Sequence, residues 1–188
     1  DVVTVIGTNL EFTFLNCGNF NGAIGNWDVS NVTNMSFMFR SNLIFNQDIS
    51  NWNVSNVTNM TAAFRDASIF NQDIGSWNVS NVENMNGMFR DAASFNQDIS
   101  GWNVSNATSM SSTFNGATTF DQPLNSWDVS SVGNFTNFML GATLQTGKYD
   151  ALLIGWEALG AGVPADGVRD NITINFGNSQ FASDEAFL

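Results

Sequence analysis

Residues 45–60 read FNQDISNWNVSNVTNM, and four closely similar strings occur in the same chain. Each copy begins 25 residues after the one before it, without an insertion or a deletion. The positions that keep this spacing in all five copies are Phe20, Phe45, Phe70, Phe95 and Phe120; Trp27, Trp52, Trp77, Trp102 and Trp127; and Val29, Val54, Val79, Val104 and Val129. Five units of 25 residues therefore span residues 20–144.

The repeat predicts a stacked architecture, because one short unit cannot bury its own apolar side chains. A period of 25 residues falls in the range of leucine-rich repeats. Polar and apolar residues alternate over residues 51–54, as in a half-buried β-strand. Val57, Met60 and Phe64 follow at intervals of three and four residues, as on one face of a helix. We predict a leucine-rich-repeat-like solenoid with one short parallel β-strand plus a short helix or 3₁₀ segment per unit.

The two ends of the chain depart from the repeat, as expected of a stacked array whose open ends would expose the core. Residues 1–19 resemble an incomplete unit, which we expect to act as an N-terminal cap. Residues 145–188 are predicted to form a C-terminal cap, with a helix over about 148–159 and a strand over about 171–176, from the spacing of their apolar residues. Residues 1–188 are thus predicted to form a single solenoid domain.

Composition narrows the classes of function. The chain has a net charge of −12 and only five Lys and Arg residues, which argues against a nucleic-acid partner, because phosphate binding needs clustered basic residues. No apolar run is long enough to span a membrane, so we expect no membrane insertion. The chain has no histidine, which is the commonest general base, so we expect that it is not an enzyme.

Cys17 is the only cysteine, so no intrachain disulfide can form. In the repeat register it occupies the small position that is held by Ala67, Ala92, Ala117 and Ala142 in later units. We therefore expect a buried and inert thiol at this position.

We expect no cofactor. Calcium stays open, because Asp and Asn oxygens are its usual ligands, although the chain has no D-x-[DN]-x-[DN]-G loop. Asn31-Val32-Thr33 and similar triplets match the N-glycosylation pattern, but a repeat rich in Asn and Thr produces such triplets by itself.

The string FNQDISNWNVSNVTNM resembles the BspA-like leucine-rich repeat surface proteins, whose units contain a Trp. The resemblance covers essentially the whole chain, including residues 149–156 and the GNSQF of residues 177–181. It implies a secreted or surface-anchored bacterial protein, and some relatives in that family are associated with adhesion to host matrix proteins. No site residues carry over, because the family has no fixed site motif.

Three units carry an Arg and, eight residues later, an Asp, and the other units lack both. An Arg and a carboxylate that come and go together indicate a structural ion pair across the turn. The predicted pairs are Arg40 with Asp48, Arg65 with Asp73, and Arg90 with Asp98.

The remaining ladders divide into core and surface. The Trp positions are in phase with the inward Val positions, which favours core packing over a sugar-stacking platform. The Ser ladder at Ser30, Ser55, Ser80, Ser105 and Ser130 has no base to activate it, and we expect it to bond backbone groups of the next coil. The outward polar residues beside each Trp are left as the candidate ligand face: Asn26, Asp28, Asn51, Asn53, Ser76, Asn78, Asn103 and Asp128.

We therefore expect a non-catalytic extracellular binding or adhesion module that recognises a protein or a glycan through this polar face. One alternative is a structural spacer, or stalk, of a larger surface protein. Another is a binder of an ordered lattice, such as crystalline polysaccharide or ice. The variation of the outward positions among Asn, Ser, Gly and Asp counts against the lattice.

Overall fold

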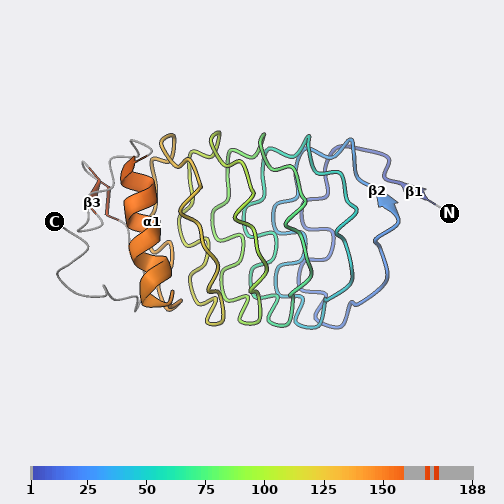
Figure 1. Cartoon of the computed structure of the whole chain (residues 1–188). Coiled ribbons are helices and arrows are strands. Elements are labelled where there is room, and N and C mark those ends of the chain that lie inside the picture. Colours follow the sequence, from blue (N-terminus) through green and yellow to red (C-terminus); the bar gives the residue numbers. More distant parts are fainter. Residues whose placement is uncertain (1, 159–167, 170–171, 174–188) are drawn as a thin grey trace.

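The computed structural model describes residues 2–158, 168–169 and 172–173. In it the repeats follow one another as stacked coils, and helix α1, Thr146–Ala158, lies across the last of them (Figure 1). The chain is therefore a repeat protein in which most of each coil lies outside regular helices and strands.

Four short strands accompany α1. Strand β1, Val3–Thr4, pairs in parallel with β2, Trp27–Asp28, at the N-terminal end of the stack. Strand β3, Val168–Arg169, pairs antiparallel with β4, Ile172–Thr173. The helix that we predicted over about 148–159 corresponds to α1. Strand β4 lies inside the predicted strand over about 171–176, of which residues 171 and 174–176 lie outside the described residues.

The strand predicted in every unit forms only at β2. In the later units the backbone beside each Trp closes local turns: the Trp52 N–H donates to Ile49 C=O, and the Ser55 N–H donates to Asn53 Oδ1. These N–H groups are therefore not available for a ladder. The coils pair further along the chain, through isolated parallel bridges that link Asn9, Asn34, Asn59, Asn84, Ser109 and Asn134 in turn.

Residues 60–66, predicted as part of a short helix, form a run of tight turns instead. Ala62 and Asp66 have left-handed φ angles of 51° and 59°, which an α-helix does not contain. The prediction was wrong because intervals of three and four residues also fit two successive turns that place the same side chains inward. Alternate backbone N–H groups of this segment donate to the next coil at 2.8–2.9 Å, from Met60 to Asn84, Ala62 to Asn86, Phe64 to Met88 and Asp66 to Arg90.

Stacked aromatic side chains fill the core, as the ladders predicted. Phe45 and Phe70 stack with ring centroids 6.0 Å apart, and Trp52 and Trp77 stack at 6.4 Å. The Trp77 Nε1–H also donates to Ile49 C=O of the preceding coil at 3.1 Å. Each Trp thereby combines a buried apolar ring with a satisfied polar group, which is what a buried indole requires. The same indole bond is made by Trp52, Trp102 and Trp127.

The prediction of a buried thiol at Cys17 was wrong, because Cys17 is exposed. The same register is fully buried in later coils, as Ala67 shows. Cys17 belongs to the first coil of the stack, so no preceding coil covers it. The second coil carries Asn42 at this register; its side chain is fully buried, and both its amide atoms lack a hydrogen-bond partner among the described residues.

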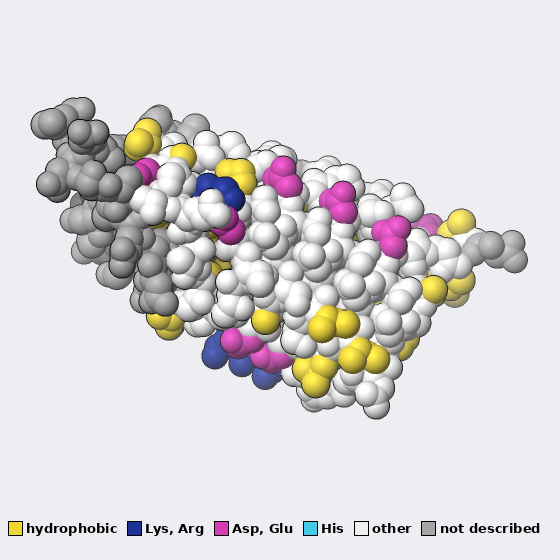
Figure 2. Space-filling model, turned by 60° about the horizontal axis from the view of Figure 1, so that its bottom comes forward, with side chains coloured by type: hydrophobic (Ala, Val, Ile, Leu, Met, Phe, Trp, Pro, Cys, Tyr) yellow, Lys and Arg dark blue, Asp and Glu magenta, His cyan; other side chains and the backbone are white. Residues whose placement is uncertain are grey.

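The predicted Arg–Asp pairs are also wrong. Asp48, Asp73 and Asp98 each accept a hydrogen bond from the backbone N–H two residues later, at 2.9 Å, so their carboxylates are held in their own turns. The arginines contact acidic residues one position after the Arg register instead. These contacts join Arg40 to Asp66 at 4.0 Å, Arg65 to Asp66 at 3.5 Å, and Arg90 to Asp91 at 3.2 Å. Figure 2 shows basic side chains gathered beside acidic ones along one edge of the stack.

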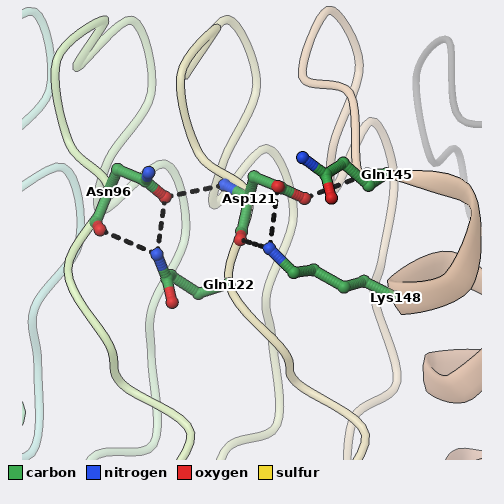
Figure 3. A network of polar contacts seen from close by, with 5 residues as sticks. All are labelled: Asn96, Asp121, Gln122, Gln145 and Lys148. Carbon is green, nitrogen blue, oxygen red and sulfur yellow. Dashed lines mark hydrogen bonds and ion pairs between the residues drawn. The ribbon is translucent and has the colours of Figure 1, made fainter.

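A ladder of side-chain amides ends at a charged pair beneath α1 (Figure 3). Asn96 Oδ1 accepts hydrogen bonds from the Asp121 N–H and from Gln122 Nε2, and Asn21, Asn46 and Asn71 make the same contacts in earlier coils. Asp121 replaces Asn in the last coil: its Oδ1 accepts from the Gln145 N–H at 2.9 Å, and its Oδ2 meets Lys148 Nζ at 2.8 Å. The ladder therefore ends on a carboxylate whose cation comes from α1.

Replacing Lys148 with Met tests this end contact. We expect Lys148→Met to lower the free energy of unfolding by about 1 kcal/mol, because the partly buried Asp121 loses its charge-assisted bond. Adding Asp121→Asn should recover part of that loss, because Asn holds this register in the earlier coils. Urea denaturation measures both values. An equal cost of Lys148→Met in the parent chain and in a chain that already carries Asp121→Asn contradicts the contact.

Candidate functional site

The predicted ligand face serves mainly to close turns. Five of its positions place a side-chain oxygen on the backbone N–H two residues later, at 3.0–3.2 Å: Asp28, Asn53, Asn78, Asn103 and Asp128. Such Asx turns fix the backbone and occupy the acceptor that a ligand would need. The Ser76 hydroxyl donates to Ser50 C=O of the preceding coil at 3.4 Å, and Asn51 is exposed. The Asn26 C=O accepts from the Val3 N–H at 3.0 Å.

The Ser ladder contacts its own turn more than its neighbour. The Ser105 hydroxyl donates to Asn103 Oδ1 at 2.8 Å, within one coil. The contact between coils runs the other way, because Asn81 Nδ2 donates to Ser55 C=O at 2.7 Å. The expectation that the Ser side chains bond the next coil was therefore wrong, and the Asn that follows each Ser makes that bond.

Four carboxylates in these turns have pKa values below the ordinary value. Each accepts a hydrogen bond from the serine hydroxyl two residues later and a second from the backbone N–H of that serine, and both favour the charged form. The lowered pKa values belong to Asp28, Asp48, Asp98 and Asp128.

A polar groove lies along the next register, across three consecutive coils. Its volume is about 460 Å³, and its lining consists of Asn56, Thr58, Asn81, Glu83, Asn106 and Thr108. We call it the acceptor groove. None of the eight residues of the predicted ligand face lines it.

The hydrogen-bond donors of the acceptor groove are largely used within the stack. Asn56, Asn81 and Asn106 each donate Nδ2 to a serine carbonyl of the preceding coil at 2.7 Å. The Thr58 and Thr108 hydroxyls donate to backbone carbonyls of the preceding coil at 3.3 Å and 3.1 Å. Because a carbonyl can only accept, these bonds fix which atom of each amide faces the neighbouring coil.

The groove is left with acceptors. The three Asn Oδ1 atoms make no hydrogen bond within the described part of the chain, and Glu83 adds an exposed carboxylate. A ligand that fits this groove must therefore bring donors, such as sugar hydroxyls or an ammonium group.

Metal ligation was the other use considered for the Asp and Asn oxygens. Among the residues that the structure describes, no three His, Cys, Asp or Glu side chains gather as a metal site would require. Glu83 is the single carboxylate in the lining of the acceptor groove.

Comparison with known proteins gives the family. A family model described as "Mycoplasma protein of unknown function, DUF285" matches residues 3–82 and 51–151. The chain belongs to this family. The two matches overlap within the repeats, so membership of DUF285 is consistent with a repeat protein. No curated protein and no solved structure matches the chain.

Among the described residues of this DUF285 chain, no helix is long and apolar enough to cross a membrane.

The acceptor groove was missed at the sequence level, although a signal for it was present. The triplets Asn56-Val57-Thr58 and Asn106-Ala107-Thr108 match the N-glycosylation pattern and were attributed to composition. In the structure the same Asn and Thr side chains line the groove, while the residue between them is buried. A polar, apolar, polar triplet repeated in register therefore indicated an outward pair of side chains over a buried anchor.

The lowered pKa values predict how stability depends on pH. A carboxylate with a lowered pKa in the folded state stabilises the fold above its unfolded-state pKa, and this contribution is lost as the pH falls through the folded-state pKa. We therefore expect the free energy of unfolding to fall as the pH drops below about 4.

The double variant Asp28→Asn with Asp128→Asn should flatten that dependence, because Asn already fills this register at Asn53, Asn78 and Asn103. Urea denaturation at a series of pH values from neutral to acidic measures it. An unchanged slope in the double variant contradicts the assignment of these carboxylates.

Proposed function

We propose that this chain is a non-catalytic binding module that recognises a glycan through the acceptor groove. The observation that carries the proposal is the one-sided hydrogen-bonding character of that groove. The amide N–H groups of Asn56, Asn81 and Asn106 are bound within the stack, and their Oδ1 atoms line the groove. A polyhydroxylated chain supplies donors at regular intervals.

The repetition of the groove supports an extended ligand. Equivalent Asn positions recur once per repeat, so successive units of a linear chain can meet equivalent acceptors. Single contacts of this kind are weak, and their sum along the array gives useful affinity. An extended protein segment with basic side chains is the other donor-rich ligand, and Glu83 together with the net charge of −12 favours it over any acidic protein.

We further propose that the stacked coils form a leucine-rich-repeat-like solenoid of the BspA-like kind, exposed on a bacterial surface. The resemblance of the FNQDISNWNVSNVTNM unit supports this assignment. A surface module of this kind has adhesion as its natural role. If the groove binds nothing, the same uniform stack fits a spacer that projects another domain.

Binding to neutral oligosaccharides tests the proposal. We expect an isothermal titration series of gluco-, manno- and chito-hexaoses to include at least one that binds, and the hexamer to bind more tightly than the dimer. Asn81→Ser should weaken that binding about tenfold, because it removes one amide acceptor at the centre of the groove. Ser131 occupies the same register in the last repeat, so the variant should fold.

Asn51→Ser is the matched control, because Asn51 is exposed outside the groove and Ser76 holds its register in the next repeat. It should bind as the parent does. Binding of hexalysine in place of every sugar would move the assignment to a basic protein segment. An absence of binding to both sugars and hexalysine would favour the spacer.

A further inference from the structure

A second groove lies across the same coils, at the register of the left-handed turns. Its volume is about 210 Å³, and Phe37, Ala62, Gly87 and Ser112 line it at equivalent positions of four successive coils. Two of the four described Lys and Arg side chains in the coils and α1, Arg65 and Arg90, also line it. We call it the donor groove.

The groove exists because side chains shrink along this register. Phe12 and Phe37 stack with ring centroids 5.1 Å apart in the first two coils. In the next coils the register holds Ala62 and then Gly87, and both have left-handed φ angles. The small residues leave a hollow whose wall on the N-terminal side includes the Phe37 ring.

The polar groups of this groove are donors without complete partners. Arg65 Nε is buried and has no hydrogen-bond partner among the described residues, although Asp66 Oδ2 lies 3.5 Å away. Arg90 uses its Nε for Asp91 at 3.2 Å, which leaves the two Nη groups at the other edge of the guanidinium. A buried N–H without a partner is costly, so these guanidinium groups are poised to bind an acceptor.

Neutral donors flank the arginines. Asn86 Oδ1 accepts from the Ser111 N–H at 3.0 Å and from the Ser111 hydroxyl at 2.9 Å, so the amide oxygen faces the protein. Its Nδ2 group makes no hydrogen bond within the described part of the chain, and neither does the Ser112 hydroxyl. The donor groove therefore has the opposite hydrogen-bonding character to the acceptor groove.

We propose that the donor groove binds a single acidic sugar residue, with its oxyanion between Arg65 and Arg90. Arg groups bind carboxylate and sulfate oxygens in a planar, bidentate geometry. The Asn86 amide, the Ser112 hydroxyl and the Phe37 ring suit the hydroxyls and the apolar face of one sugar ring. The small volume suits one ring better than a larger ligand.

The charge of the protein sets the length of the ligand. Asp66 and Asp91 contact the arginines from one side, and the chain as a whole carries a net charge of −12. A long polyanion would meet this repulsion at every unit, whereas one acidic residue in a largely neutral glycan meets it once. The donor groove and its ligand do not depend on what the acceptor groove binds.

Titration with small sugars tests the proposal. The probes are sialyllactose, a glucuronate disaccharide and a sulfated heparin disaccharide, each compared with neutral lactose by NMR or calorimetry. We expect at least one acidic sugar to bind about tenfold more tightly than lactose, with the difference shrinking as salt rises. The carboxylated and sulfated probes then identify which oxyanion the groove prefers.

Variants localise the binding. Arg65→Asn and Arg90→Asn should each weaken it about tenfold, and Ser112→Ala should weaken it less. Asn115 holds the Arg register in the following repeat, so these changes keep a residue that the fold accepts. Arg40→Asn is the control, because Arg40 belongs to the same ladder but does not line the groove, and it should bind as the parent does. Thermal melting checks that each variant is folded.

Three results would overturn the proposal. Equal affinity for lactose and the acidic sugars would remove the role of the oxyanion. Binding of hexaglutamate as tightly as the acidic sugars would assign the groove to an acidic peptide. Equal effects of Arg40→Asn and Arg65→Asn would place the binding outside the groove.

Discussion

The hydrogen bonds between successive coils at residues 60–66 and their equivalents are the constraint on which this structure depends. They require two left-handed residues per coil, such as Ala62 and Asp66. A left-handed non-glycine residue costs about 1–2 kcal/mol, and each backbone hydrogen bond contributes about 0.5–1.5 kcal/mol net. Four bonds per coil and two strained residues therefore roughly cancel. The net stability must come from the buried aromatic ladders, which only neighbouring coils can complete.

The same constraint decides which polar groups remain for binding. Along the stack, Asn81 Nδ2 and the hydroxyls of Thr58 and Thr108 are bound to carbonyls of the preceding coil. This leaves acceptors outward in one groove. At the left-handed turns, Asn86 uses its amide oxygen within the protein and leaves its N–H groups outward. Two grooves of opposite character therefore follow from how each register satisfies its own backbone.

The sequence predicted the stacking and the inward positions, because these follow from a fixed period and from apolar residues in phase. Trp77 and its equivalents were correctly placed in the core for that reason. It did not predict the turns at residues 60–66, because a helix and two successive turns can place the same side chains inward. The Arg partners were missed because Asp48 closes its own turn, a local contact that competes with the ion pair. The grooves depend on contacts between coils, such as Ala62 beside Phe37, that no single unit reveals.

Hydrogen-bond scalar couplings between backbone amides and carbonyl carbons test the central claim most directly. A long-range HNCO experiment on ¹⁵N,¹³C-labelled protein should connect the Met60 N–H with the carbonyl carbon of Asn84, and the Phe64 N–H with that of Met88. Correlations to the carbonyl carbons four residues earlier, at Asn56 and Met60, would instead show an α-helix in each repeat and contradict the account.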